Sequence, residues 1–183
     1  MEFLVFDPTY DHDESKRPLF ISELKNELST LSDEFETIET DAGFGADWPA
    51  ILAILSGIFL LGKPINENIE AWLSLSDKFK KFITTITRKS WRYRIDENGA
   101  ELLAIQEIVK KENGEIKSLK KLKSNRIEFQ IHQLKNKKHL DQHPNSLYVV
   151  SYHVSNSNIY VIGIKSNGKI EFVHALETCH MKF

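Results

Sequence analysis

Cysteine is almost absent from this sequence. Cys179 is the only one among 183 residues, so an internal disulfide is excluded and a reducing compartment is the natural expectation. The first ten residues have no basic segment ahead of an apolar one, which argues against a secretory signal peptide. We therefore expect a cytoplasmic protein, with a peripheral membrane location as the alternative.

A large net charge and a membrane-length apolar helix are also missing. The formal net charge of −2 gives no overall attraction to nucleic acid or to an anionic membrane. The most apolar segment, residues 48–61, is shorter than the roughly 20 residues that a membrane-spanning helix needs. The composition, 41% hydrophobic and 27% charged, is ordinary for a soluble globular protein of one or two small domains.

The charges that are present are unevenly distributed. Residues 1–49 contain thirteen acidic and three basic side chains, whereas residues 50–140 contain eighteen basic and ten acidic ones. Such segregation can mark surfaces for different partners. Two solvated faces of opposite charge are the simpler interpretation.

The N-terminal part has the pattern of a βαβ unit. Residues 2–7 form an apolar run before Pro8, residues 18–31 have apolar side chains at helical spacing, and residues 34–40 alternate. A strand, a helix and a second strand within forty residues favour parallel strands joined by a right-handed crossover.

The next segment is predicted to be an apolar αα-hairpin. Residues 48–61 are uncharged on every face and residues 65–86 form an amphipathic pattern, with Gly62 and Pro64 between them. The tight turn favours antiparallel packing of the two helices. The first helix is expected to be buried in the core or to contact a partner or a membrane. The predicted contact residues are Trp48, Ile51, Leu55, Phe59 and Trp72.

The C-terminal part is predicted to be a second α+β half. The patterns indicate a strand at 91–95, a helix at 100–111, a short helix at 116–122 and a strand at 127–131. From residue 147 the pattern is β throughout, with Asn167 and Gly168 as a strong hairpin signal, which predicts a three-stranded antiparallel meander. The expected fold class is α+β, with domains at 1–88 and 89–183.

No group of side chains completes a catalytic mechanism, so an enzyme is not the expected class and no cofactor is expected. The weak metal candidates Asp7, Asp11, Asp13 and Asp41 follow predicted strands, where carboxylates can converge on Mg²⁺. A solvated acidic loop explains them better. The pair His139 and His143 has a zinc-compatible spacing, but the following Pro144 indicates a loop.

Residues 88–126 are basic, with aromatic residues among the cations. Arg92, Arg94, Trp91 and Tyr93 would be the nucleic-acid contacts, through phosphates and stacked bases. A lysine-rich solvated face is the simpler interpretation, because a count of basic residues does not define a groove.

Together these patterns favour a non-catalytic interaction or adaptor protein of bacterial type that docks a protein partner. The reasons are the uncharged apolar segment and the charge segregation, both of which suit a docking surface. Two alternatives stay open. One is a membrane-associated effector or accessory protein that inserts the helix at 48–61, and the other is a nucleic-acid-binding protein that uses residues 88–126.

Overall fold

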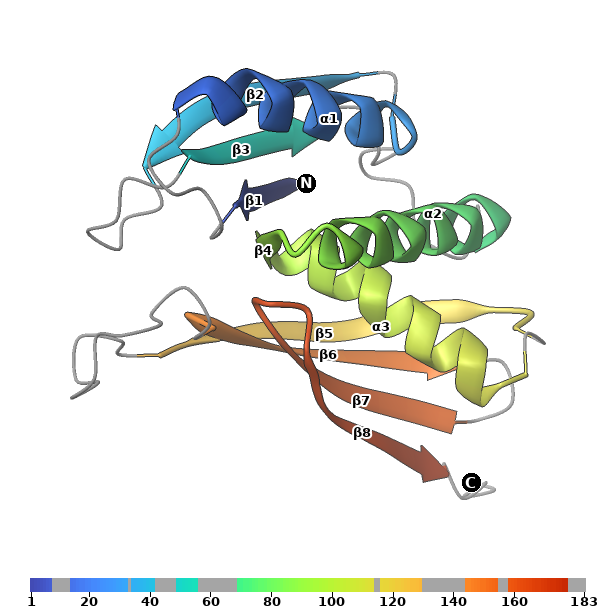
Figure 1. The fold of residues 1–183 in the computed structure, drawn as a ribbon. Helices are drawn as coiled ribbons and strands as arrows, with labels where there is room; N and C mark the ends of the chain where they lie inside the picture. The colour runs from blue at the N-terminus through green and yellow to red at the C-terminus, as the bar shows by residue number, and fades with distance from the viewer. Residues whose placement is uncertain are drawn as a thin grey trace.

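The structure is a computed structural model that describes residues 1–7, 14–32, 34–41, 49–55, 69–113, 116–129, 144–154 and 158–177. Over these residues the chain forms two four-stranded antiparallel sheets and three α-helices, together with a short 3₁₀ turn at Glu14–Lys16 (Figure 1). The predicted α+β class is confirmed. We refer to the N-terminal sheet as sheet A and to the C-terminal sheet as sheet B.

Sheet A has the strand order β2-β3-β1-β4, and every neighbouring pair is antiparallel. Its strands are β1 (Glu2–Phe6), β2 (Phe35–Asp41), β3 (Pro49–Leu55) and β4 (Arg92–Ile95). Helix α1 (Arg17–Ser29) connects β1 to β2 as predicted. Both strands pair antiparallel with β3, which lies between them, so they run in the same direction, as expected for parallel strands of a βαβ unit.

A helix was predicted at 48–61. The structure describes residues 49–55 of this segment, and there the prediction is wrong because they form the strand β3. This strand has apolar side chains on both faces: Ile51 and Ala53 pack in the main core, and Ala50 packs with Phe6 on the opposite face. A short apolar run of this kind does not distinguish a strand from a buried helix. Residues 56–68 lie outside the described residues, so the αα-hairpin is not found in the described part of the chain.

Helix α2 (Ile69–Arg88) confirms the amphipathic pattern and packs against sheet A. Phe3 of β1 meets Phe79 and Phe82 of α2 edge-on, with ring centroids 6.3 and 5.0 Å apart. Phe20 of α1 meets Trp91 in the same way at 4.8 Å. Aromatic pairs of this geometry add about 0.5–1.5 kcal/mol beyond the area that they bury, so these rings fix both helices on one face of the sheet.

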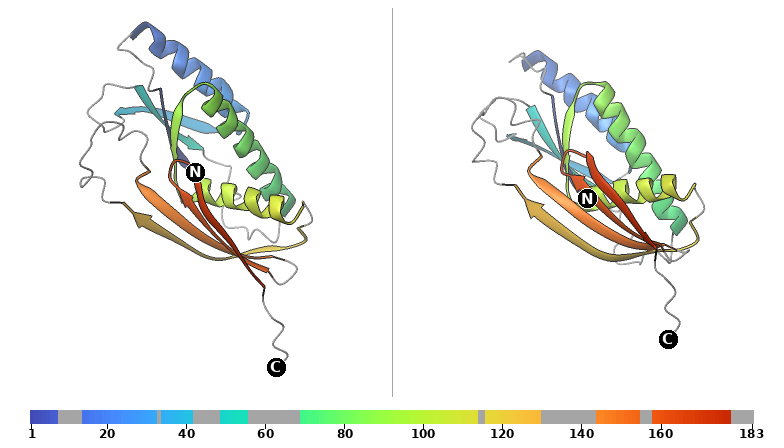
Figure 2. Two further views of the ribbon diagram at one scale, coloured as in Figure 1. Left: turned by 60° about the horizontal axis from the view of Figure 1, so that its bottom comes forward. Right: turned by 90° about the horizontal axis from the view of Figure 1, so that it is seen from below.

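Sheet B consists of β5 (Leu119–Glu128), β6 (Ser146–Val154), β7 (Asn158–Lys165) and β8 (Ile170–Glu177), in that order. Strands β6, β7 and β8 confirm the predicted meander. Helix α3 (Glu97–Lys111) covers one face of this sheet and lies between it and α2 (Figures 1 and 2).

The predicted short helix at 116–122 is wrong, because strand β5 begins at Leu119 and includes the start of the predicted strand at 127–131. The prediction placed Leu119 and Leu122 on one face of a helix, because residues three apart share a helical face. In the strand they lie in different environments, Leu119 buried and Leu122 exposed next to a β-bulge between Lys121 and Lys123.

The two sheets share one core. The main cluster of buried residues includes Phe3 and Val5 of sheet A, Ile105 of α3, and Val150 and Ile162 of sheet B. Strand β4 follows the predicted domain boundary at 88/89, yet it pairs with β1 of the preceding half.

The end of β4 joins the two sheets through the backbone of Ile95. The Ile95 N–H donates to the carbonyl of Ser166, on the β7–β8 turn, at 2.8 Å. The Ile95 carbonyl accepts from the hydroxyl of Tyr148 on β6 at 3.1 Å. A strand of sheet A is thereby hydrogen-bonded to two elements of sheet B.

The next residue, Asp96, caps α3. Its Oδ1 accepts from the N–H of Gly99 at 2.9 Å, and its Oδ2 accepts from the N–H of Glu2 at 2.8 Å. One carboxylate therefore satisfies the helix N-terminus and also holds the first residue of β1.

We expect Asp96→Ala to lower the free energy of unfolding by about 1–2 kcal/mol, because the helix cap is lost together with the acceptor for Glu2. The measurement is urea denaturation, read as a lower midpoint at an unchanged m-value. Asp96→Asn keeps an acceptor oxygen for Gly99 and should lose less. Equal losses in the two variants would contradict the capping role.

The C-terminus of α2 ends in a Schellman motif without glycine. Trp91 N donates to Ile86 O at 3.2 Å, and Ser90 N donates to Thr87 O at 3.1 Å. Ser90 occupies the left-handed position with φ 63°, a conformation in which glycine is normally found because it has no Cβ.

Ser90→Gly should therefore raise the free energy of unfolding by about 0.5–1 kcal/mol, since it removes the strain of a side chain at positive φ. Thermal denaturation should show Tm higher by about 2 °C. The matched control is Ser74→Gly at an exposed position inside α2, where the same change is expected to destabilise the helix. A loss of stability in both variants would show that Ser90 is not strained.

Candidate functional site

Only two of the five predicted partner contacts have side chains that the structure describes, and neither lies on the surface. Ile51 and Trp72 are buried in the main core, so we do not retain them as contact residues. Trp48, Phe59 and the side chain of Leu55 lie outside the described residues. None of the described helices is long and apolar enough to cross a membrane.

The four predicted nucleic-acid contacts are divided between the two faces of sheet A. Tyr93 lies on the face that α1 and α2 cover, whereas Arg92 and Arg94 lie on the opposite face, opposite Phe6 and Leu4 of β1. Trp91 is buried against Phe20.

The ring of Tyr93 packs closely against Gly168 of the β7–β8 turn, where a Cβ would lie 2.3 Å from the tyrosine hydroxyl. Burial raises the pKa of Tyr93 to about 12. Tyr93 therefore packs at the junction between the sheets and Trp91 packs against α1, so the two rings do not form a stacking platform.

The weak metal candidates are not brought together in the described part of the chain, where no group of three His, Cys, Asp or Glu side chains has metal-binding geometry. Asp7 directly follows β1 and is half-buried. Asp11, Asp13 and the side chain of Asp41 lie outside the described residues, as do His139 and His143.

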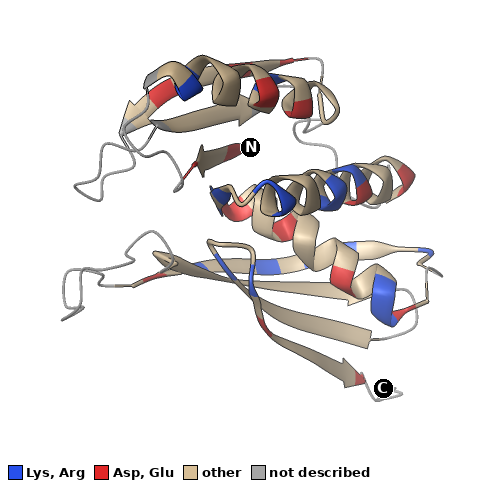
Figure 3. Cartoon of the chain, in the orientation of Figure 1, with Lys and Arg blue, Asp and Glu red and all other residues tan. Residues whose placement is uncertain are grey.

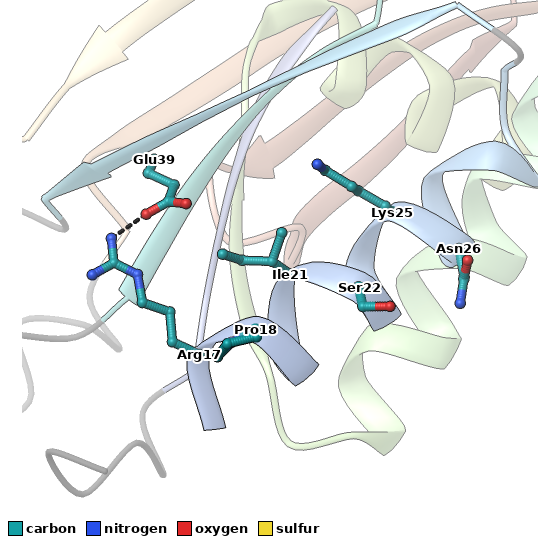
Figure 4. A pocket seen from close by; sticks show the side chains of 7 residues that line it. All are labelled: Arg17, Pro18, Ile21, Ser22, Lys25, Asn26 and Glu39. Carbon is teal, nitrogen blue, oxygen red and sulfur yellow. Dashed lines mark hydrogen bonds and ion pairs between the residues drawn. The ribbon is translucent and has the colours of Figure 1, made fainter. Parts of the chain in front are cut away.

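One open cavity lies between α1 and β2 (Figure 4). Its volume is about 560 Å³, and its lining includes Ile21, Ser22 and Lys25 of α1. At one end Arg17 forms an ion pair with Glu39 of β2. The lining side chains are mostly exposed, and they do not include a nucleophile with an adjacent base, so the cavity does not define a reaction.

The face of sheet B that points away from α3 has apolar side chains that no described helix covers. The register places alternate residues of all four strands on this face. We call it the outer face. It comprises Lys120, Lys123, Asn125, Ile127, Leu147, Val149, Ser151, His153, Ile159, Val161, Gly163, Lys165, Phe172, His174 and Leu176.

Aliphatic side chains occupy the middle of the outer face. Val149, Ile159 and Val161 are half-buried there, and no described helix or strand covers them (Figure 2). Phe172 lies over Gly163, where a Cβ would be 2.3 Å from the ring. The glycine therefore lets the aromatic ring lie close against the sheet and continue the aliphatic surface.

The charges of the outer face gather at its margin. Lys120 and Lys123 lie on β5, and Lys165 forms an ion pair with Glu171 at 2.5 Å. His153 and His174 lie on β6 and β8, with β7 between them. The surface therefore has an aliphatic centre, which Ser151 and His153 of β6 adjoin, and lysines at its margin.

The opposite, inner face of sheet B contains a buried polar group. Glu101 of α3 is buried and pairs with Lys121 of β5. Its pKa is raised, mainly because burial disfavours the carboxylate, while the Lys121 ammonium opposes this shift. The nearby Tyr152 hydroxyl is buried and has no hydrogen-bond partner among the described residues.

The raised pKa of Glu101 predicts a specific pH dependence. Between the ordinary glutamate pKa and the raised one the folded state binds more protons than the unfolded state, so stability falls as the pH rises through this window. Glu101→Gln removes this effect.

The free energy of unfolding of the wild type should therefore fall as the pH is raised from about 4 to 7, whereas that of Glu101→Gln should not fall for this reason. The difference, variant minus wild type, should become more positive over this range. Urea denaturation at several pH values measures the difference. The opposite trend would show that the ion pair with Lys121 outweighs the cost of burying the carboxylate.

The outer face was not among the predicted contacts, although the sequence contains a signal for it. In the strands within residues 147–165, apolar side chains occur at both the odd and the even positions. In β6, for example, Tyr148 and Val150 lie on one face, and Leu147 and Val149 lie on the other. A strand with one fully solvated face would show a cleaner alternation.

No protein-family model, curated protein or solved structure matches this chain.

Proposed function

We propose that this chain is a non-catalytic interaction protein that binds a protein partner through the outer face of sheet B. The supporting observation is the aliphatic centre of this face, which the described residues leave open. Exposed apolar surface with a polar margin is the usual composition of a protein-binding patch.

The chemistry of the face favours protein over nucleic acid. Surfaces that bind single-stranded nucleic acid present aromatic rings on which bases stack. Here the central positions are Val149, Val161 and Ile159, and the one aromatic ring apart from the histidines, Phe172, lies against Gly163. Aliphatic side chains instead complement the apolar side chains of another polypeptide.

The two alternatives have less support. Membrane insertion depended on a helix at 48–61, of which residues 49–55 are a strand within sheet A. Nucleic-acid binding through residues 88–126 was to use Trp91 and Tyr93 as stacking rings, and these rings pack against Phe20 and Gly168. The outer face uses neither the segment 48–61 nor these two rings.

Site-specific photo-cross-linking tests the proposal. A benzophenone amino acid replaces Leu176, which is 54% exposed on the outer face, and in a control it replaces the exposed Lys78 of α2. We expect one discrete protein adduct in an extract of the native cells from position 176 and none from position 78.

Val161→Lys, which puts a charge into the centre of the outer face, should abolish that adduct while circular dichroism shows a folded protein. An adduct that survives Val161→Lys would contradict the proposal. So would an adduct that ribonuclease or deoxyribonuclease removes, because the partner would then be a nucleic acid.

A further inference from the structure

Strand β5 is the most exposed element of sheet B. It is an edge strand, and among its side chains only Leu119 is buried and only Ser124 is half-buried. The other edge strand, β8, differs because its residues Ile170 and Val173 pack against the core. Within the described part of the chain, β5 thus has an open backbone edge and side chains exposed on both faces.

Exposed hydrophobic residues concentrate at this edge. Leu122, Ile127 and Phe129 are 48%, 50% and 37% exposed, and they are three of the six large hydrophobic residues found exposed among the described residues. Such side chains on an edge strand are a hazard unless the edge is protected or has a partner.

The edge is also cationic. Lys120, Lys121, Lys123 and Arg126 are its basic residues, and Glu128 is its only acidic one (Figure 3). Lys121 pairs with Glu101, and Arg126 pairs with Glu128 at 3.1 Å. Lys120 and Lys123 form no ion pair with any described residue. We call these four cations and the backbone of β5 the basic edge.

Lysines on an edge strand normally prevent pairing with other chains. This protection depends on the sign of the charge, since cations opposite cations repel, whereas carboxylates opposite the same cations attract. The basic edge therefore discriminates against neutral and basic strands and in favour of an acidic one.

We propose that the basic edge accepts an acidic extended segment of the protein partner as a fifth strand of sheet B. Main-chain hydrogen bonds to β5 would supply affinity, and carboxylates opposite Lys120 and Lys123 would supply specificity. This inference rests on the proposed function, because the acidic strand is taken to belong to the same protein partner that binds the outer face.

The register makes the basic edge continuous with the outer face. Lys120 lies opposite His153, Lys123 opposite Ser151, and Ile127 opposite Leu147, all on the same side of the sheet. Alternate side chains of an added strand would therefore extend the outer face beyond β5. Lys120 and Lys123 flank the bulge, and from Lys123 to Glu128 the register of β5 with β6 is regular, which gives the new strand a regular template over that part of β5.

The experiment uses a fluorescent peptide of alternating glutamate and valine, as long as β5, titrated with the full chain and followed by fluorescence anisotropy. We expect saturable binding that weakens as sodium chloride is raised from about 0.05 to 0.3 M. Lys120→Glu combined with Lys123→Glu should weaken binding about tenfold. The matched control, Lys78→Glu with Lys80→Glu on the exposed surface of α2, should leave binding unchanged.

Two further peptides separate strand pairing from simple charge attraction. The same peptide with every second amide N-methylated cannot form the main-chain ladder and should not bind, and a lysine–valine peptide should be repelled. Equal binding of the N-methylated peptide, or no saturable binding of the acidic one, would overturn the inference. Light scattering provides a further test. If the wild-type protein forms dimers and the Lys120→Glu, Lys123→Glu variant does not, the inference is overturned, because the strand added to the basic edge would then come from a second copy of this chain.

The outcome for the edge is distinguishable from the outcome for the outer face. If the photo-adduct at position 176 forms normally while the acidic peptide does not bind, only the basic edge is refuted. If the acidic peptide binds and no adduct forms at position 176, the proposed outer face is refuted.

Discussion

The structure depends on two consecutive residues at the end of β4. Ile95 uses its N–H and its carbonyl to bond Ser166 and Tyr148 of sheet B, while Asp96 caps α3 and holds Glu2 of sheet A. Gly99 permits this arrangement, because a Cβ there would lie 2.9 Å from the Cβ of Ile95. The orientation of α3 relative to both sheets thus depends on a few polar contacts, of which the Tyr148–Ile95 hydrogen bond is buried and would be costly to lose.

Helix α3 shows how this junction shapes the surface. The four consecutive residues at 102–105 are all buried, because α2 lies on one side of the helix and sheet B on the other. Gln106 donates to Ser76 of α2 at 2.8 Å, which satisfies two polar side chains inside this contact. Since α3 covers only the inner face of sheet B and α2 lies behind α3, the fold itself leaves the outer face open among the described elements.

The sequence predicted the elements whose period is regular and failed where a local feature broke or hid the period. The meander, α1 and α2 followed from alternation and helical spacing. Strand β3 was mistaken for a helix because a strand with apolar side chains on both faces has no period-two signature. The start of β5 was misread because Leu119 and Leu122 have helical spacing, although they lie in different environments in the strand. Trp91 and Tyr93 were considered as base-stacking residues because cations flank them, and the sequence does not show that Phe20 of α1 and Gly168 of the β7–β8 turn pack against these rings.

The same limit applies to the candidate site and explains its character. A lysine in β5 has the same sequence signature whether it protects the edge or recognises an acidic strand, and only the strand order shows that β5 is an edge at all. The pairing with β6 then places Lys120 and Lys123 beside the aliphatic centre of the outer face. Charge at an open backbone edge, next to an uncovered apolar surface, defines a site that is selective for a strand's charge and tolerant of its detailed sequence. Such a site is built from register and topology, which is why no short motif in the chain predicts it.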